Sequence, residues 1–190
     1  MADVRSQVYE AIQVLKKGGV ILYPSDTVWG LGCDPCNPEA VQKLFKIKER
    51  AKDKAVITLI SEIGHLNQYV TEVPEIAWDL VECADKPLTV VYPDGKNVAK
   101  EILAEDNSIA IRHVKDGFCQ RLVHSFGRGV TSTSANKSGA SSPVKFSDIS
   151  KEIIEACDFV VDESMGSSKE AAPSQIIRLD VNNGFKLIRS

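Results

Sequence analysis

Hydrophobic and polar positions follow two distinct patterns along this chain. Near the N-terminus, apolar residues recur at the spacing of one helix face, at Val8, Ile12 and Leu15. This pattern ends at a pair of glycines, which suits the C-terminus of a helix. The continuous apolar run 20–23 that follows predicts a short buried strand. The chain therefore opens with a helix and then a strand.

The same alternation continues to the C-terminus. Asn37 followed by Pro38 predicts the N-cap and first position of a helix that continues to Ile47. Further helices are expected over 75–81, 116–126 and 147–156, and strands over 56–60, 88–92, 108–111, 159–161 and 175–179. Strands interleaved with helices of this length predict an α/β layered fold with a parallel or mixed sheet. Because no repeat or linker interrupts the pattern, we expect one domain over residues 1–190.

Length and composition agree with a globular α/β domain. A chain of 190 residues with 43% hydrophobic content can form a substantial core. No apolar run approaches the roughly 18 residues of a membrane span, and the N-terminus predicts an amphipathic helix instead of a signal peptide. Five cysteines, an odd number, fit a reducing compartment better than a disulfide framework. We expect a cytoplasmic protein with no membrane contact.

Cys33 and Cys36 have the spacing of half a zinc site. The remaining cysteines are isolated, and the three histidines show no ligand spacing. We therefore expect structural thiols and no dedicated metal site. By the same argument Asp26 and Asp34 are expected to be loop carboxylates instead of metal ligands.

Residues 131–143 are rich in serine and threonine and contain one asparagine. Gly129-Val130 is interpreted as the end of a short buried strand, so the hydroxyl groups are expected in a loop where the sheet opens. Open parallel sheets bind ligands at such positions. The alternative is an ordinary Ser/Gly-rich surface linker.

A basic segment lies at the predicted end of the second helix, over residues 43–54. Its net positive charge is local, because the whole chain has a formal net charge of −3. The alternative is a solvated helix end, whose cations suit the negative end of the helix dipole. A hydroxyl-rich segment and a basic segment in one small α/β domain together predict a polyphosphate site. The cations are Lys43, Lys46, Lys48, Arg50, Lys52 and Lys54.

Two short motifs resemble a known family. Lys48-Glu49-Arg50 matches a K-x-R motif and Ser134-Ala135-Asn136 an S-x-N motif. Both occur in the YrdC-like L-threonylcarbamoyladenylate synthases. Five more segments resemble family motifs in collinear order: 23–32 resembles "PTETVYGLG", 86–89 "GPLT", 108–112 "VxVR", 173–177 "PSTVV" and 187–189 "xxR". The resemblance covers residues 7–190 and implies a twisted open sheet around a basic concave cavity.

The resemblance implies an enzyme that joins L-threonine, bicarbonate or CO2, and ATP into threonylcarbamoyl-AMP and releases pyrophosphate. This product supplies the t6A modification of tRNA, so tRNA and other t6A-forming proteins are implied partners. The reaction brings a carboxylate, a carbamate and a triphosphate together, and such chemistry depends on positioning and on concentrated positive charge. Mg²⁺ is expected to arrive with ATP, because this ion keeps most of its waters and binds phosphate oxygens.

The resemblance also assigns residues to each substrate. The residues implied in ATP binding are Lys48, Arg50, Lys54, Ser108, Ser134, Asn136, Ser142 and Arg189. The residues implied in threonine binding are Thr27, Arg112, Ser132 and Ser174, with Arg112 as the partner of the carboxylate. The catalytic group is expected to be Lys48, Arg50, Ser134 and Asn136.

Three positions depart from the family pattern. Ala51 follows the K-x-R motif where proline is usual, Asp26 replaces a common glutamate, and Leu59 stands where many relatives have a histidine. Two other functions therefore stay open: a non-synthase paralog that binds or hydrolyses a nucleotide, and a module that binds double-stranded RNA through phosphate contacts. The negative net charge disfavours the RNA module. Retention of both K-x-R and S-x-N disfavours the paralog.

Overall fold

The sheet that organises the molecule has nine strands in the order β7-β1-β2-β6-β3-β5-β4-β8-β9. The structure is a computed structural model, which describes residues 3–49, 56–166, 173–180 and 184–189. The pairs β1–β7, β3–β5 and β4–β8 are parallel and the other neighbours antiparallel, so the predicted α/β fold with a mixed sheet is confirmed. The strands are β1 Ile21–Pro24, β2 Trp29–Gly32, β3 Ile57–Ile60, β4 Leu88–Tyr92, β5 Ile109–His113, β6 Val130–Ser134, β7 Phe159–Val160, β8 Gln175–Leu179 and β9 Phe185–Arg189.

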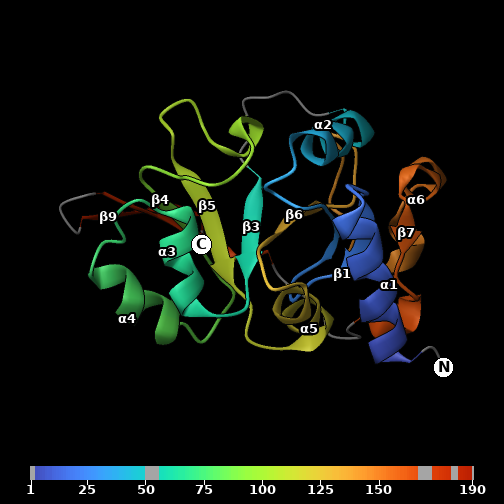
Figure 1. Ribbon diagram of the computed structural model, residues 1–190, viewed down its shortest axis with the longest axis horizontal. Helices are drawn as coiled ribbons and strands as arrows, with labels where there is room; N and C mark the ends of the chain where they lie inside the picture. The colour runs from blue at the N-terminus through green and yellow to red at the C-terminus, as the bar shows by residue number, and fades with distance from the viewer. Residues whose placement is uncertain (1–2, 50–55, 167–172, 181–183, 190) are drawn as a thin grey trace.

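Helices flank the sheet (Figure 1). Helices α1 and α5 pack against each other and both contact β1, while α3 and α4 lie beside the half of the sheet that contains β3, β4 and β5. No helix of the described residues is both long and apolar enough to cross a membrane. The α-helices are α1 Val4–Lys16, α2 Pro38–Ile47, α3 Leu66–Tyr69, α4 Ile76–Glu82, α5 Gly117–Phe126 and α6 Lys151–Ala156; short 3-10 helices occupy η1 Ile63–His65, η2 Lys100–Ile102, η3 Phe146–Asp148 and η4 Glu163–Met165.

The predicted cap of α2 fixes where the basic segment begins. Asn37 accepts hydrogen bonds from the backbone N–H groups of Glu39 and Ala40, at 3.0 and 3.1 Å, and Pro38 occupies the first turn. The helix ends at Ile47 with Lys48 as its C-cap, and Glu49 then adopts a left-handed conformation with φ of 49°. This turn ends the helix directly at the K-x-R motif.

The interpretation of the hydroxyl-rich segment as a loop is wrong for its first residues. Val130–Ser134 forms strand β6, and the loop begins only at Ala135. The β-branched Thr131 and Thr133 suit a pleated strand. The hydroxyl of Thr131 accepts the backbone N–H of Cys33 at 2.7 Å, so a polar side chain is satisfied inside the sheet.

Other differences from the predicted elements are small. Strand β2 is four residues long with two glycines, and β9 is exposed along its whole length, so neither shows a clear hydrophobic pattern. Helix α6 begins at Lys151, and the earlier part of the predicted helix 147–156 contains the end of η3.

Strand register places several candidate side chains on one side of the sheet. Ser132 pairs with Ile57, Leu59 pairs with Arg112, and Arg112 pairs with Thr89. Directly paired residues point to the same side, and so do residues two apart on a strand. The same side therefore also receives Ser134, two residues after Ser132.

Candidate functional site

Lys48 joins helix α2 to the S-x-N loop. Its side chain is buried, with 2% of the residue exposed. The Nζ ammonium donates hydrogen bonds to the backbone oxygens of Ser134 and of Asn136, the second at 2.8 Å. The backbone oxygen of Lys48 accepts the N–H of Ser138 at 2.9 Å. The first residue of the K-x-R motif thus fixes the loop that carries the S-x-N motif. It also places a positive charge against the backbone of this loop.

The S-x-N loop is stabilised further by its own side chains. The Ser134 hydroxyl donates to Oδ1 of Asn136. The amide nitrogen of Asn136 donates to the backbone oxygens of Lys137 and Ala140, at 3.1 and 2.6 Å. These bonds leave the backbone of the loop in a defined conformation, which is the preorganisation that electrostatic binding of an anion needs.

Ion pairs connect the same loop to the end of α2 and to α6. Lys137 Nζ lies 2.7 Å from Glu49 and 2.6 Å from Glu152. The hydrogen bond to Glu152, followed by the one to Glu49, raises the pKa of Lys137. Because all three side chains are at the surface, each pair contributes little stability on its own.

The hydrogen bonds that hold this loop in the described residues include none of the other residues predicted to bind ATP. Arg50 and Lys54 lie outside the described residues. Ser142 is exposed on the segment that follows the S-x-N loop. Ser108 lies directly before β5, where its backbone N–H donates to Asp106 at 3.1 Å. Hydrogen bonds from the Ser108 hydroxyl and from Arg178 lower the pKa of Asp106 to about 2.

Arg112 and Asp26 form a buried ion pair on the other half of the site. Arg112 Nη2 lies 2.8 Å from Asp26 Oδ1, and the two side chains are 3% and 11% exposed. Burial raises the pKa of Asp26, although the Arg112 charge acts in the opposite direction. The Nε of Arg112 has no hydrogen-bond partner among the described residues.

Thr27 lies in the β1–β2 turn, next to Asp26. The hydroxyl of Ser25 accepts the backbone N–H groups of Thr27 and Val28, at 3.1 and 3.2 Å, and donates to the backbone oxygen of Val28 at 2.7 Å. The Thr27 and Ser25 hydroxyl oxygens are 3.0 Å apart. Ser25 therefore fixes the turn that presents Thr27 and Asp26 together.

Ser174 connects β4 to the C-terminal strand. Its hydroxyl lies 2.8 Å from that of Thr89 in the buried interior. Arg189 donates to the backbone oxygen of Ser174 from Nε and Nη2, at 3.1 and 2.7 Å. The structure thus brings Arg189, which the sequence assigned to ATP, into contact with a residue assigned to threonine.

Ser132 lies on β6 between the two halves. Burial raises the pKa of the Tyr23 phenol, and the neighbouring Ser132 hydroxyl acts in the opposite direction. Tyr23 in turn donates to the backbone oxygen of Thr131 at 3.0 Å.

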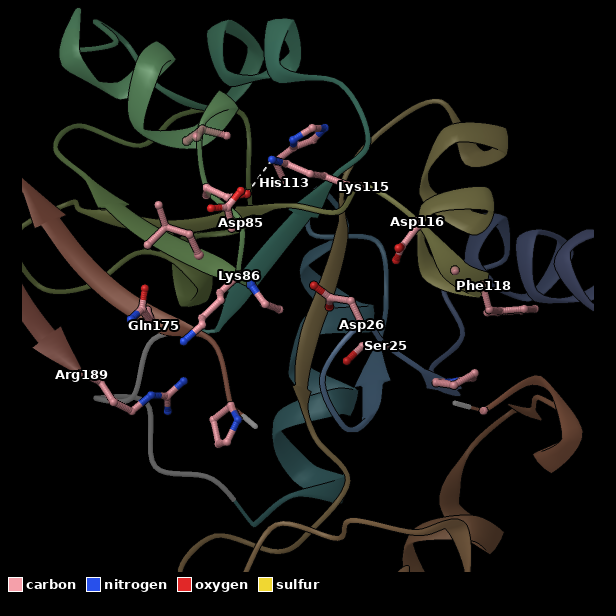
Figure 2. A pocket seen from close by; sticks show the side chains of 18 of the residues that line it. Ser25, Asp26, Asp85, Lys86, His113, Lys115, Asp116, Phe118, Gln175 and Arg189 are labelled. Carbon is pink, nitrogen blue, oxygen red and sulfur yellow. Dashed lines mark hydrogen bonds between the residues drawn. The ribbon is translucent and has the colours of Figure 1, made fainter. Parts of the chain in front are cut away.

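An open cleft of about 940 Å³ lies beside the Asp26 turn (Figure 2). Asp26 and Ser25 project into this cleft from one side, and Lys86 and Arg189 from the other. Lys115 and Asp116 also line it, so its wall carries both signs of charge. The basic character predicted for the cavity stays a prediction, because much of the basic segment lies outside the described residues.

Sequence reasoning missed two features of this half. Asp26 is a loop carboxylate, as predicted, but its pairing with Arg112 was not predicted, and neither was the position of Lys86 in the cleft. The signal for Asp26 was its position beside Thr27 in the segment that resembles "PTETVYGLG". Its pairing with Arg112 joins residues far apart in the sequence, and only the fold could place them together.

All cysteines of the described residues are free, and those residues contain no cluster of three or more His, Cys, Asp or Glu side chains suited to a metal ion. Cys33 and Cys119 are buried. Burial raises the pKa of each of these two thiols to about 12, so both are neutral at physiological pH.

Comparison with known proteins gives consistent matches. A family model for Sua5, YciO and YrdC, described as "Telomere recombination", matches residues 13–190. A protein named Threonylcarbamoyl-AMP synthase from Pseudoalteromonas translucida is 35% identical over 97% of this chain and 97% of its own. A protein of the same name from Idiomarina loihiensis is 32% identical over 98% of both chains.

Solved structures agree on the fold. The crystal structure of P. abyssi Sua5 complexed with L-threonine has a TM-score of 0.85 at 25% identity, covering 94% of this chain and 52% of that one. This chain therefore spans about half the length of that protein. The crystal structure of E. coli YciO has a TM-score of 0.83 at 21% identity, covering 100% of this chain and 90% of the other.

Proposed function

Because the chain belongs to the Sua5/YciO/YrdC family, we propose that it makes threonylcarbamoyl-AMP from L-threonine, bicarbonate or CO2, and ATP, and releases pyrophosphate. One observation carries this proposal: a relative named for this product is 35% identical along 97% of both chains. The names of the relatives do not favour a non-synthase paralog or a double-stranded RNA-binding protein.

The ATP phosphates bind at the loop held by Lys48. Its buried ammonium supplies charge beneath the backbone of Ser134 and Asn136, and this arrangement supports a role in holding an anion. Arg50 and Lys54 add cations from the segment that follows, because guanidinium and ammonium groups bind phosphate oxygens well. Ser108, Ser142 and Arg189 contribute further nucleotide contacts. Mg²⁺ enters with ATP, bound mainly by phosphate oxygens and water.

Threonine binds on the Arg112 half. The free Nε of this buried guanidinium is a donor suited to a carboxylate, which supports the assignment of Arg112 to the substrate carboxyl group. Thr27, Ser132 and Ser174 supply hydroxyl groups around it. The protein acts in the cytoplasm, where its product is passed to the t6A-forming proteins that modify tRNA.

Pyrophosphate release by the purified full-length chain tests the function. With ATP, Mg²⁺ and bicarbonate, we expect release only when L-threonine is added, and little change on addition of RNA. Equal turnover without threonine would contradict the synthase proposal and favour a nucleotide hydrolase. Absence of turnover together with RNA binding that weakens steeply with salt would favour the RNA module.

A further inference from the structure

The Asp26–Arg112 pair is buried but incomplete. Nη2 of Arg112 lies 2.8 Å from Oδ1 of Asp26 and pairs with that oxygen, whereas the Nε of Arg112 has no hydrogen-bond partner among the described residues. Buried polar atoms are nearly always paired, because water no longer satisfies them. The unpaired Nε, behind a carboxylate that lines the cleft, indicates a place where a ligand supplies the missing partner.

A second carboxylate–arginine pair shows what a complete arrangement looks like. Asp34 is exposed to the same extent as Asp26, 11%, and lies 3.2 Å from Arg128. Its Oδ1 accepts the backbone N–H of Cys36 at 2.8 Å, and its Oδ2 accepts from Arg128. Arg128 is 53% exposed, so water satisfies the rest of its guanidinium. Burial of a carboxylate in this fold therefore does not by itself leave an atom unpaired.

The Asp26 side of this pair is open to a small molecule. Asp26 lines the cleft and projects into it beside Ser25 (Figure 2). Arg112 lies on β5, where the apolar Leu59 is its direct neighbour on β3. A ligand that enters the cleft thus meets the Asp26 carboxylate first, and the buried guanidinium of Arg112 lies directly behind it, 2.8 Å from Oδ1, in surroundings that strengthen charge interactions.

An α-amino acid carries a carboxylate and an ammonium on the same carbon atom. A neighbouring guanidinium and carboxylate match these two charges. We propose that Asp26 binds the ammonium group of the amino-acid substrate while Arg112 binds its carboxylate, and that Asp26 then accepts the proton that the amine must lose. The inference rests on the proposed function, and it adds a catalytic role for Asp26 to it.

The proton transfer is balanced within this pair. The ammonium N–H bond breaks, its electrons stay on nitrogen, and the proton moves to the carboxylate of Asp26. The neutral amine then uses its lone pair to form the C–N bond to CO2, while one C=O electron pair moves to oxygen. The second proton of the nitrogen leaves to water in the cleft, and the product is the carbamate.

The surroundings of Asp26 suit a base. Burial, assisted by the charge of Asp116, raises the pKa of Asp26 against the opposing effect of Arg112. Cys119 on α5 and Tyr23 on β1 lie near Asp26. Burial raises the pKa of both groups, so they stay neutral and do not compete for the proton. A carboxylate with a raised pKa is a better proton acceptor than an exposed one.

Ligand discrimination tests the inference without relying on turnover. Calorimetry compares L-threonine with the hydroxy acid in which a hydroxyl replaces its amine, using wild type, Asp26→Asn and the matched control Asp34→Asn. Wild type and Asp34→Asn should prefer threonine. Asp26→Asn should lose at least about thirtyfold in threonine affinity and bind the hydroxy acid at least as tightly as wild type does, because the ammonium partner is lost while the charge of Arg112 is no longer neutralised by a carboxylate.

Two further measurements separate the possible failures. Asp26→Glu should restore part of the preference for threonine. In wild type and Asp34→Asn, kcat/KM for threonine should fall as the pH is lowered and Asp26 becomes protonated. This fall should be absent in Asp26→Asn. Unchanged discrimination in a folded Asp26→Asn, checked by thermal melting and ATP binding, would overturn the role of Asp26. If instead wild type releases no pyrophosphate, the proposed function is wrong. The calorimetric comparison of threonine with the hydroxy acid still decides whether Asp26 binds the ammonium group.

Discussion

The two halves of the candidate site are built in opposite ways. Around Lys48, the side chains of Ser134 and Asn136 and the backbone of the loop satisfy one another. Around Arg112, the buried Nε of the guanidinium lacks a hydrogen-bond partner among the described residues. In the Lys48 half, the side chains have hydrogen-bond partners before any ligand binds. In the Arg112 half, we expect the ligand to supply the missing partner. Mutations in the first should therefore affect stability as well as activity, whereas mutations in the second should act mainly through substrate affinity.

Lys48→Ala should have the largest effect. Turnover should fall about a hundredfold or more, as expected when one preorganised charge is removed from a binding site. Stability should also fall, by about 1–3 kcal/mol, because buried carbonyl oxygens of the S-x-N loop lose their donor. Kinetics and thermal melting of the variant measure both changes.

The neighbouring Lys46→Ala provides the control for Lys48→Ala. Lys46 is exposed on the last turn of α2, so its removal should change neither turnover nor melting temperature appreciably. A Lys48→Ala variant with wild-type stability would show that the loop does not depend on the buried ammonium. From the sequence alone, the contribution of Lys48 to stability is expected to be that of a cation at a helix end, about 0.3 to 1 kcal/mol.

Arg112→Ala should raise the KM for threonine far more than that for ATP. Removing one member of a buried charge pair costs about 2 to 5 kcal/mol of binding. This variant also leaves Asp26 buried without its partner, so the pKa of Asp26 should rise further and the protein should lose some stability. Titration of each substrate, with a thermal melt alongside, measures these effects.

A different outcome would make Arg112 a structural residue. In that case the variant would raise both KM values alike. The double variant Asp26→Asn/Arg112→Ala distinguishes the two effects, because it removes the unpaired buried charge. It should recover stability relative to Arg112→Ala and still bind threonine weakly.

Local signals predicted most of the elements, and long-range contacts decided the site. Asn37-Pro38 identified the start of α2 because a cap depends on residues within one turn. The strand β6 was taken for a loop because serine and threonine are typical of both, and only pairing with β2 and β3 satisfies its backbone. The partners of Lys48 and Arg112 come from segments 86 residues or more away in the chain, which no local pattern identifies.

Ser174→Ala tests a residue that combines features of both halves. Ser174 lies on the Arg112 half, but its hydroxyl already has a hydrogen-bond partner, Thr89, as the polar groups around Lys48 do. Loss of one buried hydrogen bond should lower stability by about 1 kcal/mol and raise the KM for threonine moderately. Thr89→Val serves as the control, since it removes the same bond while keeping Ser174. If both variants change stability equally but only Ser174→Ala changes the KM, the Ser174 hydroxyl contacts the substrate.

The smallest expected effect concerns the exposed ion pair at the opposite end of β5 from Arg112. Arg178 and Asp106 are 43% and 52% exposed, and the pKa of Asp106 is lowered to about 2. Because an ordinary aspartate has a pKa of about 3.9, the folded state binds the proton less tightly than the unfolded state. The pair and its hydrogen bonds therefore stabilise the fold above about pH 4, and this contribution is lost as the pH falls through about 2. Solvent screening limits this contribution to roughly 1 kcal/mol or less.

Asp106→Asn should thus lower the free energy of unfolding slightly at neutral pH, and the difference from wild type should disappear in acid. Denaturant titrations of both proteins across this pH range measure it. A loss as large as that of Lys48→Ala would contradict the contrast between exposed and buried charges on which the other predictions depend.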